Sequence, residues 1–232
     1  MDTIYDQDDS VPQVSNIAVN NTEQRTPCVL LIDCSASMQG RPMQQVNAGF
    51  RDFERAIKDD PFTASRVLVS VIAFGGDSAR IVMDWTEAED FVAPTFDASG
   101  LTPMGGAVEM GLDEIDRVKQ SLRLNGITCT RPWMFILTDG EPTDAGWEAA
   151  ADRCATAAAN KKVVVWALTT EPGQAGKLSR FVGPGMGVFD IEGADLQSMF
   201  VWLSSSLSAA SEPGAGATRN IPAPGQMIAV EV

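Results

Sequence analysis

Five oxygen-bearing side chains from three separate segments could together bind a cation. They are Asp33, Ser35, Ser37, Thr102 and Asp139. The first three form a D-x-S-x-S sequence on one loop, where alternate side chains converge if the backbone turns. The two aspartates would neutralise a dication, and the three hydroxyls would add weak neutral ligands. An all-oxygen ligand set suits a hard ion, first of all Mg²⁺ and then Mn²⁺ or Ca²⁺, with positions left for water or a partner.

Each part of this pattern also has a purely structural interpretation. Serine and aspartate commonly cap helices, so a lone D-x-S-x-S is a frequent loop composition. Asp139 followed by Gly140 is, by itself, an ordinary turn signal. The combination is more specific, because it needs the motif after one apolar run, a threonine in a G-x-T-x-x-G loop before a long helix, and an aspartate after another apolar run. We therefore predict a metal site.

The composition excludes many other kinds of chemistry. The chain has no histidine, which rules out His-dependent proton shuttles, Ser–His–Asp triads, Cys–His pairs and imidazole-based zinc or iron sites. The four cysteines form no C-x-x-C pair, so neither a zinc cluster nor a disulfide framework is expected. They are interpreted as reduced and mostly buried thiols, with Cys34 as the candidate for a reactive one. Any metal must be held by oxygen.

The charge of the chain limits its partners. A net charge of −14 repels phosphate backbones, so binding of nucleic acid through a basic patch is not expected. No apolar run approaches the ~20 residues that a membrane span requires, so no membrane partner is expected. Residues 1–10 are acidic and lack the positive and apolar regions of a secretory signal. Together with the reduced cysteines, this predicts a cytoplasmic location.

The elements that must position these side chains alternate along the chain. Short continuous apolar runs are typical of parallel strands that are buried on both faces, whereas an alternating run suits an edge strand. The buried strands are expected over 28–33, 66–74, 132–137 and 162–168, the edge strand over 80–85, and a sixth strand over 187–191. Apolar residues at helical spacing predict helices over 43–57, 104–122, 144–160 and 195–207. The tryptophans at 133, 147, 166 and 202 are interpreted as core residues.

This alternation predicts an α/β fold with a doubly wound, mostly parallel sheet, helices on both faces and one antiparallel edge strand. The pattern allows a strand order of 3-2-1-4-5-6, in which the first and fourth strands are neighbours at the topological switch point. Asp33 and Asp139 directly follow those two strands. Both carboxylates are therefore expected at one crevice, at the carboxyl ends of the strands.

The two ends of the chain are expected to differ from the domain over 27–211. Residues 1–26 are predicted to be an acidic polar leader, partly disordered, with a short edge strand over 11–19 as an alternative. Residues 212–232 are predicted to be a Pro- and Gly-rich tail. Its last residues, 227–232, alternate enough to add a strand in cis or in trans.

With this motif and this order of elements, the chain resembles the von Willebrand factor A/integrin I-type family over roughly residues 27–210. That family carries a metal-ion-dependent adhesion site of the form D-x-S-x-S, then Thr, then Asp, and the matching positions here are the five residues named first. The resemblance implies a doubly wound fold, a Mg²⁺ or Mn²⁺ ion, and binding of a protein partner through an acidic residue. If one of the two aspartates bound the ion through water, the ion would stay electron-poor and would favour the carboxylate of the partner's acidic residue.

A narrower resemblance lies in the segments 126–143, 200–208 and the Pro-rich tail. These are similar to TerY-like bacterial proteins, which are associated with tellurium resistance, stress response and phage defence. That resemblance implies partnership with a Ser/Thr protein kinase and a PP2C-type phosphatase, and it implies an interaction module that is not an enzyme.

Three other functions remain open from the residues alone. A haloacid dehalogenase-like phosphatase also has an aspartate after its first strand, but it needs a second aspartate as general acid where this chain has Ser35. A nucleotide-binding protein would need a glycine-rich fingerprint after the first strand or a G-x-x-x-x-G-K-[ST] loop, and neither is present. A structural scaffold with an incidental cation is the third.

Overall fold

A six-stranded sheet runs through the centre of the computed structural model, which describes Val14 and residues 17–169, 175–182, 188–190, 196–212, 218–223 and 226–231. The strand order is β3-β2-β1-β4-β5-β6, as the alternation allowed. All neighbouring strands are parallel except β3, which pairs antiparallel with β2 at the edge. The strands are β1 (Thr26–Asp33), β2 (Val67–Gly75), β3 (Ser78–Glu87), β4 (Trp133–Thr138), β5 (Val164–Thr169) and β6 (Val188–Asp190).

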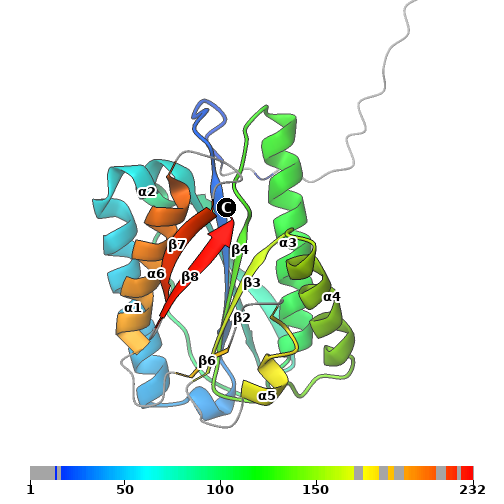
Figure 1. Ribbon diagram of the computed structural model, residues 1–232. Helices are drawn as coiled ribbons and strands as arrows, with labels where there is room; N and C mark the ends of the chain where they lie inside the picture. The colour runs from blue at the N-terminus through cyan, green and yellow to red at the C-terminus, as the bar shows by residue number, and fades with distance from the viewer. Residues whose placement is uncertain are drawn as a thin grey trace, which may run out of the picture.

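Helices cover both faces of this sheet, which gives three layers (Figure 1). One face carries α1 (Arg41–Asp59), α2 (Pro61–Arg66) and α6 (Leu196–Ser211). The other face carries α3 (Met104–Leu124), α4 (Trp147–Ala159) and the short α5 (Ala175–Leu178). Two 3₁₀ turns, η1 (Ala36–Met38) and η2 (Ala88–Asp90), lie in the connections. The predicted fold class is confirmed.

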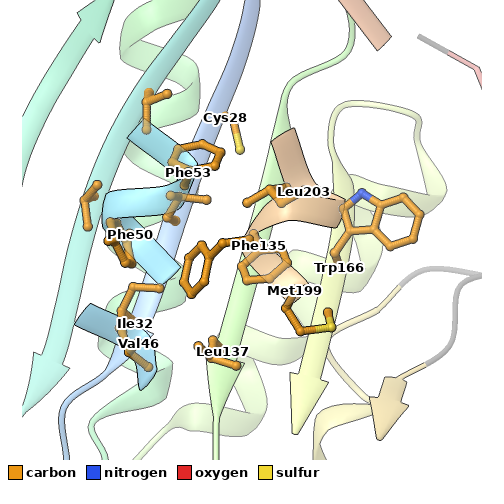
Figure 2. Packing of buried hydrophobic residues seen from close by; sticks show 14 of the residues in the cluster. Cys28, Ile32, Val46, Phe50, Phe53, Phe135, Leu137, Trp166, Met199 and Leu203 are labelled. Atoms are coloured by element: carbon orange, nitrogen blue, oxygen red, sulfur yellow. The ribbon is translucent and has the colours of Figure 1, made fainter. Parts of the chain in front are cut away.

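The central strands are mostly apolar because both of their faces are buried. Along β1, Leu30 and Ile32 point into the layer beneath α1 and α6, whereas Leu31 points toward α3. Figure 2 shows the first layer, where Phe50 of α1 faces the sheet beside residues of β4 and α6. The rings of Phe50 and Phe200 have centroids 4.8 Å apart, so the two helices interlock above β1 and β4.

The four tryptophans that were predicted as core residues all pack in or against the core. Trp133 and Trp166 are fully buried on neighbouring strands, with ring centroids 5.4 Å apart. Trp202 of α6 packs edge-on against Trp166, and Trp147 of α4 is partly buried beside Phe181. Their role as packing residues is confirmed.

Residues before β1 also pack on the domain where the structure describes them. Val14 and Ile17 are buried in the core beneath α3, and the main chain of Arg25 hydrogen-bonds to Thr128 and Thr130. The alternative of a strand over 11–19 falls mostly outside the described residues, and residues 17–20 form a bend and a turn.

A separate two-stranded antiparallel hairpin is formed by β7 (Thr218–Ala223) and β8 (Gln226–Glu231), beside α6. β8 matches the strand predicted for the end of the chain, and it pairs in cis. β7 was not predicted, because the Pro- and Gly-rich composition of this region masked its strand pattern. Among the described helices, none is long and apolar enough to cross a membrane.

Candidate functional site

Asp33 and Asp139 meet at the carboxyl ends of two adjacent parallel strands. Asp33 is the last residue of β1, and Asp139 directly follows β4. The pairing of Ile32 with Leu137 sets the two strands in register, so both strands end at the same level. This is the topological switch point of the sheet, because the chain passes from β1 to α1 on one face and from β4 to α4 on the other.

The loop after β1 folds back on the carboxylate of Asp33. The main-chain N–H of Ser35 donates to Asp33 Oδ1 at 2.7 Å, and the Oγ atoms of Ser35 and Ser37 are 3.0 Å apart. Ser37 Oγ then donates to Asp139 Oδ1 at 2.8 Å. A continuous set of hydrogen bonds thus joins four of the predicted residues. Asp33 and Ser35 are buried, whereas Ser37 is exposed, so the set opens to solvent on one side.

Thr102 is held beside this set by the loop after β4. A Cβ atom on Gly140 would lie 3.7 Å from Thr102 Oγ1, so the threonine hydroxyl faces the turn that follows Asp139. Thr143 fixes the main chain of Thr102 from both sides: its Oγ1 accepts from the Thr102 N–H at 2.9 Å, and its N–H donates to the Thr102 carbonyl at 3.0 Å. All five predicted side chains are therefore brought together.

The loop before Thr102 is also tied to the loop after β1. The N–H of Ser99 donates to the Cys34 carbonyl at 2.7 Å, and the N–H of Ala36 donates to the Gly100 carbonyl at 3.0 Å. Gly100 has a φ of +72°, and a Cβ there would lie 2.4 Å from Gly76 Cα. Only glycine fits this close approach of two backbones. Leu101 follows and is 59% exposed.

Three positioning residues were missed by the sequence reasoning. Thr138 donates from its hydroxyl to Asp33 Oδ2, Thr143 holds Thr102, and Asp144 accepts from the N–H groups of Gly105 and Gly106 at 3.1 and 2.8 Å. Asp144 was assigned to the helix predicted over 144–160, which is wrong at its start, because α4 begins at Trp147. The carboxylate instead caps the amino end of α3. The only sequence signal was the run of turn-forming and polar residues over 138–144.

The family model of the von Willebrand factor type A domain matches residues 28–192, which is more than half of the chain. The chain belongs to this family. The matched range contains most of β1, all of β2 to β6 and all five predicted side chains. A comparison of this von Willebrand factor type A (vWA) domain with curated protein sequences returned no match.

Solved structures with the same fold come from varied proteins. The pilus adhesin SpaC from Lactobacillus rhamnosus GG in its open conformation aligns with a TM-score of 0.61 and 15% identity, over 80% of this chain and 30% of that one. Proximal thread matrix protein 1 from the mussel byssus aligns with a TM-score of 0.52 and 16% identity, over 82% and 47%. The N-terminal domain of TFIIH p34 aligns with a TM-score of 0.57 and 17% identity, over 80% and 99%.

These likenesses show the fold alone, because every identity is below a fifth. The chain spans less than half of the length of the adhesin and of the mussel protein. As a vWA domain, the chain is a member of a family of general protein-interaction modules.

The electrostatics of the vWA domain's site are dominated by two neighbouring carboxylates. Burial raises the pKa of Asp33 to about 6; hydrogen bonds from Ser35 and Thr138 oppose this rise, and the charge of Asp139 adds to it. Burial also raises the pKa of the Cys34 thiol to about 12, which disfavours a reactive thiolate there. The carboxylates thus repel each other in an interior that a cation would neutralise.

The donor set fits a hard cation. Among the described residues, no group of three or more His, Cys, Asp and Glu side chains is placed to hold a metal, so an ion here would need the hydroxyls as well as the carboxylates. Oxygen ligands from two aspartates and three hydroxyls match the preference of Mg²⁺, which also retains water.

Proposed function

We propose that this vWA domain is a metal-dependent docking module that binds a partner protein through a carboxylate of the partner. Asp33, Ser35, Ser37, Thr102 and Asp139 would hold a Mg²⁺ ion, or Mn²⁺ or Ca²⁺ in its place. The observation that carries the proposal is the hydrogen-bonded path Asp33–Ser35–Ser37–Asp139, which brings two carboxylates together across the switch point.

The chain's own residues have separate tasks in this proposal. Asp33 and Asp139 supply the negative charge, and the hydroxyls complete the oxygen cluster. Thr138, Thr143 and Asp144 hold the carboxylate and the Thr102 loop in place, so little rearrangement is needed on binding. The bound ion supplies the positive charge that an incoming carboxylate requires on a chain with a net charge of −14.

We further propose the biological setting that the narrower resemblance implies. The partners would be a Ser/Thr kinase and a PP2C-type phosphatase, in a bacterial system for tellurium resistance, stress response or phage defence. Support for this step comes only from the segments that resemble TerY-like proteins. A cytoplasmic location is proposed with it, and it is supported by the four free cysteines, of which three are buried. The domain boundaries are proposed as 27 and 211.

The site supports binding better than catalysis. A haloacid dehalogenase-like phosphatase would need a proton donor at the position of Ser35, whose side chain is buried against Ser37. A serine hydroxyl does not deliver a proton efficiently at neutral pH. We therefore propose that the domain is not an enzyme. Hydrolysis of a generic phosphate ester that disappears in Asp33→Asn would contradict this proposal.

Calorimetric titration of the domain with MgCl₂ and with MnCl₂ tests the metal site. We expect one binding site in the wild type and no measurable binding in Asp33→Ala or Asp139→Ala. Asp59→Ala is the matched control, because Asp59 is an exposed aspartate at the far end of α1. If the wild type and Asp139→Ala bind the metal equally well, the ion is incidental and the scaffold alternative is supported.

Affinity purification tests the partners. Wild type and Asp139→Ala would be compared with Mg²⁺ and with EDTA, and a kinase and a PP2C-type phosphatase should be recovered only with the wild type in Mg²⁺. Recovery that is unaffected by EDTA and by the substitution would exclude metal-dependent docking.

A further inference from the structure

A recess lies on the segments that flank the candidate metal site. Its volume is about 380 Å³, and it is lined by the first turns of α1 and by the loop before Thr102. Gln39 on its wall lies two residues after Ser37, and Ala98 precedes the Ser99–Gly100 segment that is hydrogen-bonded to the loop after β1. The recess therefore adjoins the position that a docked partner would occupy.

The walls of the recess are fixed before any partner arrives. The side-chain amide of Asn47 donates to the Phe96 carbonyl at 2.9 Å and accepts from the Phe96 N–H at 2.8 Å, which joins α1 to the opposite wall. Phe96 itself is buried, and its ring lies 4.9 Å from that of Phe50. A recess built in this way loses little entropy when it is filled.

The polar groups that remain available in the recess are acceptors for a cation. Asp97 is exposed and forms no ion pair in the described part of the chain, although the exposed Arg41 and Arg80 belong to nearby segments. Gln39 and Gln44 are exposed, and their amide groups make no hydrogen bond to described residues. The amino end of α1 contributes only about half of a positive charge, against the full negative charge of Asp97.

We propose that this recess binds an arginine or lysine side chain of the partner segment whose carboxylate docks at the metal site. The inference rests on the proposed function and specifies the partner: an acidic residue with a basic residue close to it in sequence. The net charge of −14 favours a partner of this kind, because an acidic segment gains from a basic residue that offsets its repulsion by the chain as a whole. Asp97 would be the specificity-determining residue, and the amides of Gln39 and Gln44 would accept further hydrogen bonds from the cation.

Two pools of fluorescent nonapeptides test this inference by fluorescence anisotropy with the full chain. Both pools have a central aspartate among alanine and serine. One pool has arginine at a single varied flanking position, and the other has glutamate there. In Mg²⁺ we expect the arginine pool to bind the wild type about threefold to fivefold more tightly than the glutamate pool. This preference should fall clearly in Asp97→Asn and remain in the control Asp59→Asn, which removes the same charge at the other end of α1 and so accounts for the effect of net charge.

The outcomes separate the inference from the proposed function. If both pools bind equally and only with Mg²⁺ and an intact Asp33, the recess inference is overturned and the metal site stands. A preference that is as large in Asp97→Asn as in Asp59→Asn also overturns the inference. If the arginine pool binds equally well in EDTA and to Asp33→Ala, joint docking is excluded together with the proposed function. Absence of binding by either pool counts against both. Unchanged thermal melts of the variants would show that folding is not the cause.

Discussion

The two ends of the sheet bury charge in opposite ways. At the amino end of β1, the buried Arg25 pairs with the buried Glu87 at 3.2 Å and donates to main-chain carbonyls that include those of Ser65 and Asn21. At the carboxyl end, the buried charges of Asp33 and Asp139 have the same sign. The first cluster contains its own compensating charge, whereas the second needs one from outside.

This difference distinguishes a structural charge cluster from a binding one. In both places burial raises a carboxyl pKa, but the charge of Arg25 lowers that of Glu87, whereas Asp139 raises that of Asp33 further. Buried charges of opposite sign compensate each other, so the removal of one leaves the other without a counter-charge. Buried charges of the same sign repel each other, and a bound cation removes this repulsion. The comparison therefore predicts different responses to substitution at the two ends.

The largest effect is expected when the self-compensated cluster is broken. Arg25→Leu should lower the free energy of unfolding by about 3–5 kcal/mol, because it leaves Glu87 buried without a counter-charge. Urea denaturation measures this, with the exposed Arg51→Leu as control. The double variant Arg25→Leu/Glu87→Leu should recover much of the loss. If it recovers nothing, the pair is not what stabilises this end.

At the other end, the effect should come from the ion. Mg²⁺ at about one hundred times its Kd should raise the free energy of unfolding of the wild type by about 2.7 kcal/mol. In Asp33→Asn this gain should vanish, whereas the metal-free stability should stay equal or rise because one buried like charge is removed. Thermal melts with MgCl₂ and with EDTA measure both quantities, with Asp59→Asn as control. If metal-free Asp33→Asn is clearly less stable than the metal-free wild type, Asp33 is a structural residue.

A smaller effect is expected from the residues that hold the site together. Asp144→Ala removes the cap of α3 and should destabilise the domain by about 1 kcal/mol. It should also weaken Mg²⁺ binding in calorimetry, because the Thr102 loop is anchored at the same place. Glu148→Ala, an exposed change in the first turn of α4, should alter neither quantity. Unchanged Mg²⁺ affinity in Asp144→Ala would separate the helix cap from the site.

The smallest effect on stability is expected at the surface of the site. Leu101→Ser should change the free energy of unfolding by less than about 0.5 kcal/mol, because the residue is 59% exposed. It should nevertheless weaken binding of the arginine peptide pool, since an apolar side chain beside a docking site adds contact area. The exposed Val92→Ser is the matched control. If peptide affinity is the same in both variants, Leu101 lies outside the docking surface.

Much of the fold could be predicted because the information is local. β1, β2, β4 and β5 were found as continuous apolar runs, since a strand that is buried on both faces needs apolar side chains at every position. The convergence of Asp33 and Asp139 followed from strand order, because parallel neighbours end at the same edge. Whether the site binds a metal stays a prediction.

Other features could not be read from local patterns. The start of α4 was misplaced because Asp144 caps α3 instead of joining the helix that follows it. β7 was missed because it contains turn-forming residue types, and its strand conformation depends on pairing with β8. The recess beside the site depends on contacts between Asn47 and Phe96, which are 49 residues apart.

The amino-acid sequence by itself determined which residue types are available and on which elements they lie. With no histidine and with aspartates after two buried strands, it restricted any metal to oxygen ligands at one end of the sheet. Only the tertiary structure decided which hydroxyls reach which carboxylates, which loops hold them, and where a neighbouring recess opens. The physical reason is separation along the sequence. Hydrophobic periodicity can be read from residues that are close in sequence, whereas these hydrogen bonds join distant segments that only packing brings together.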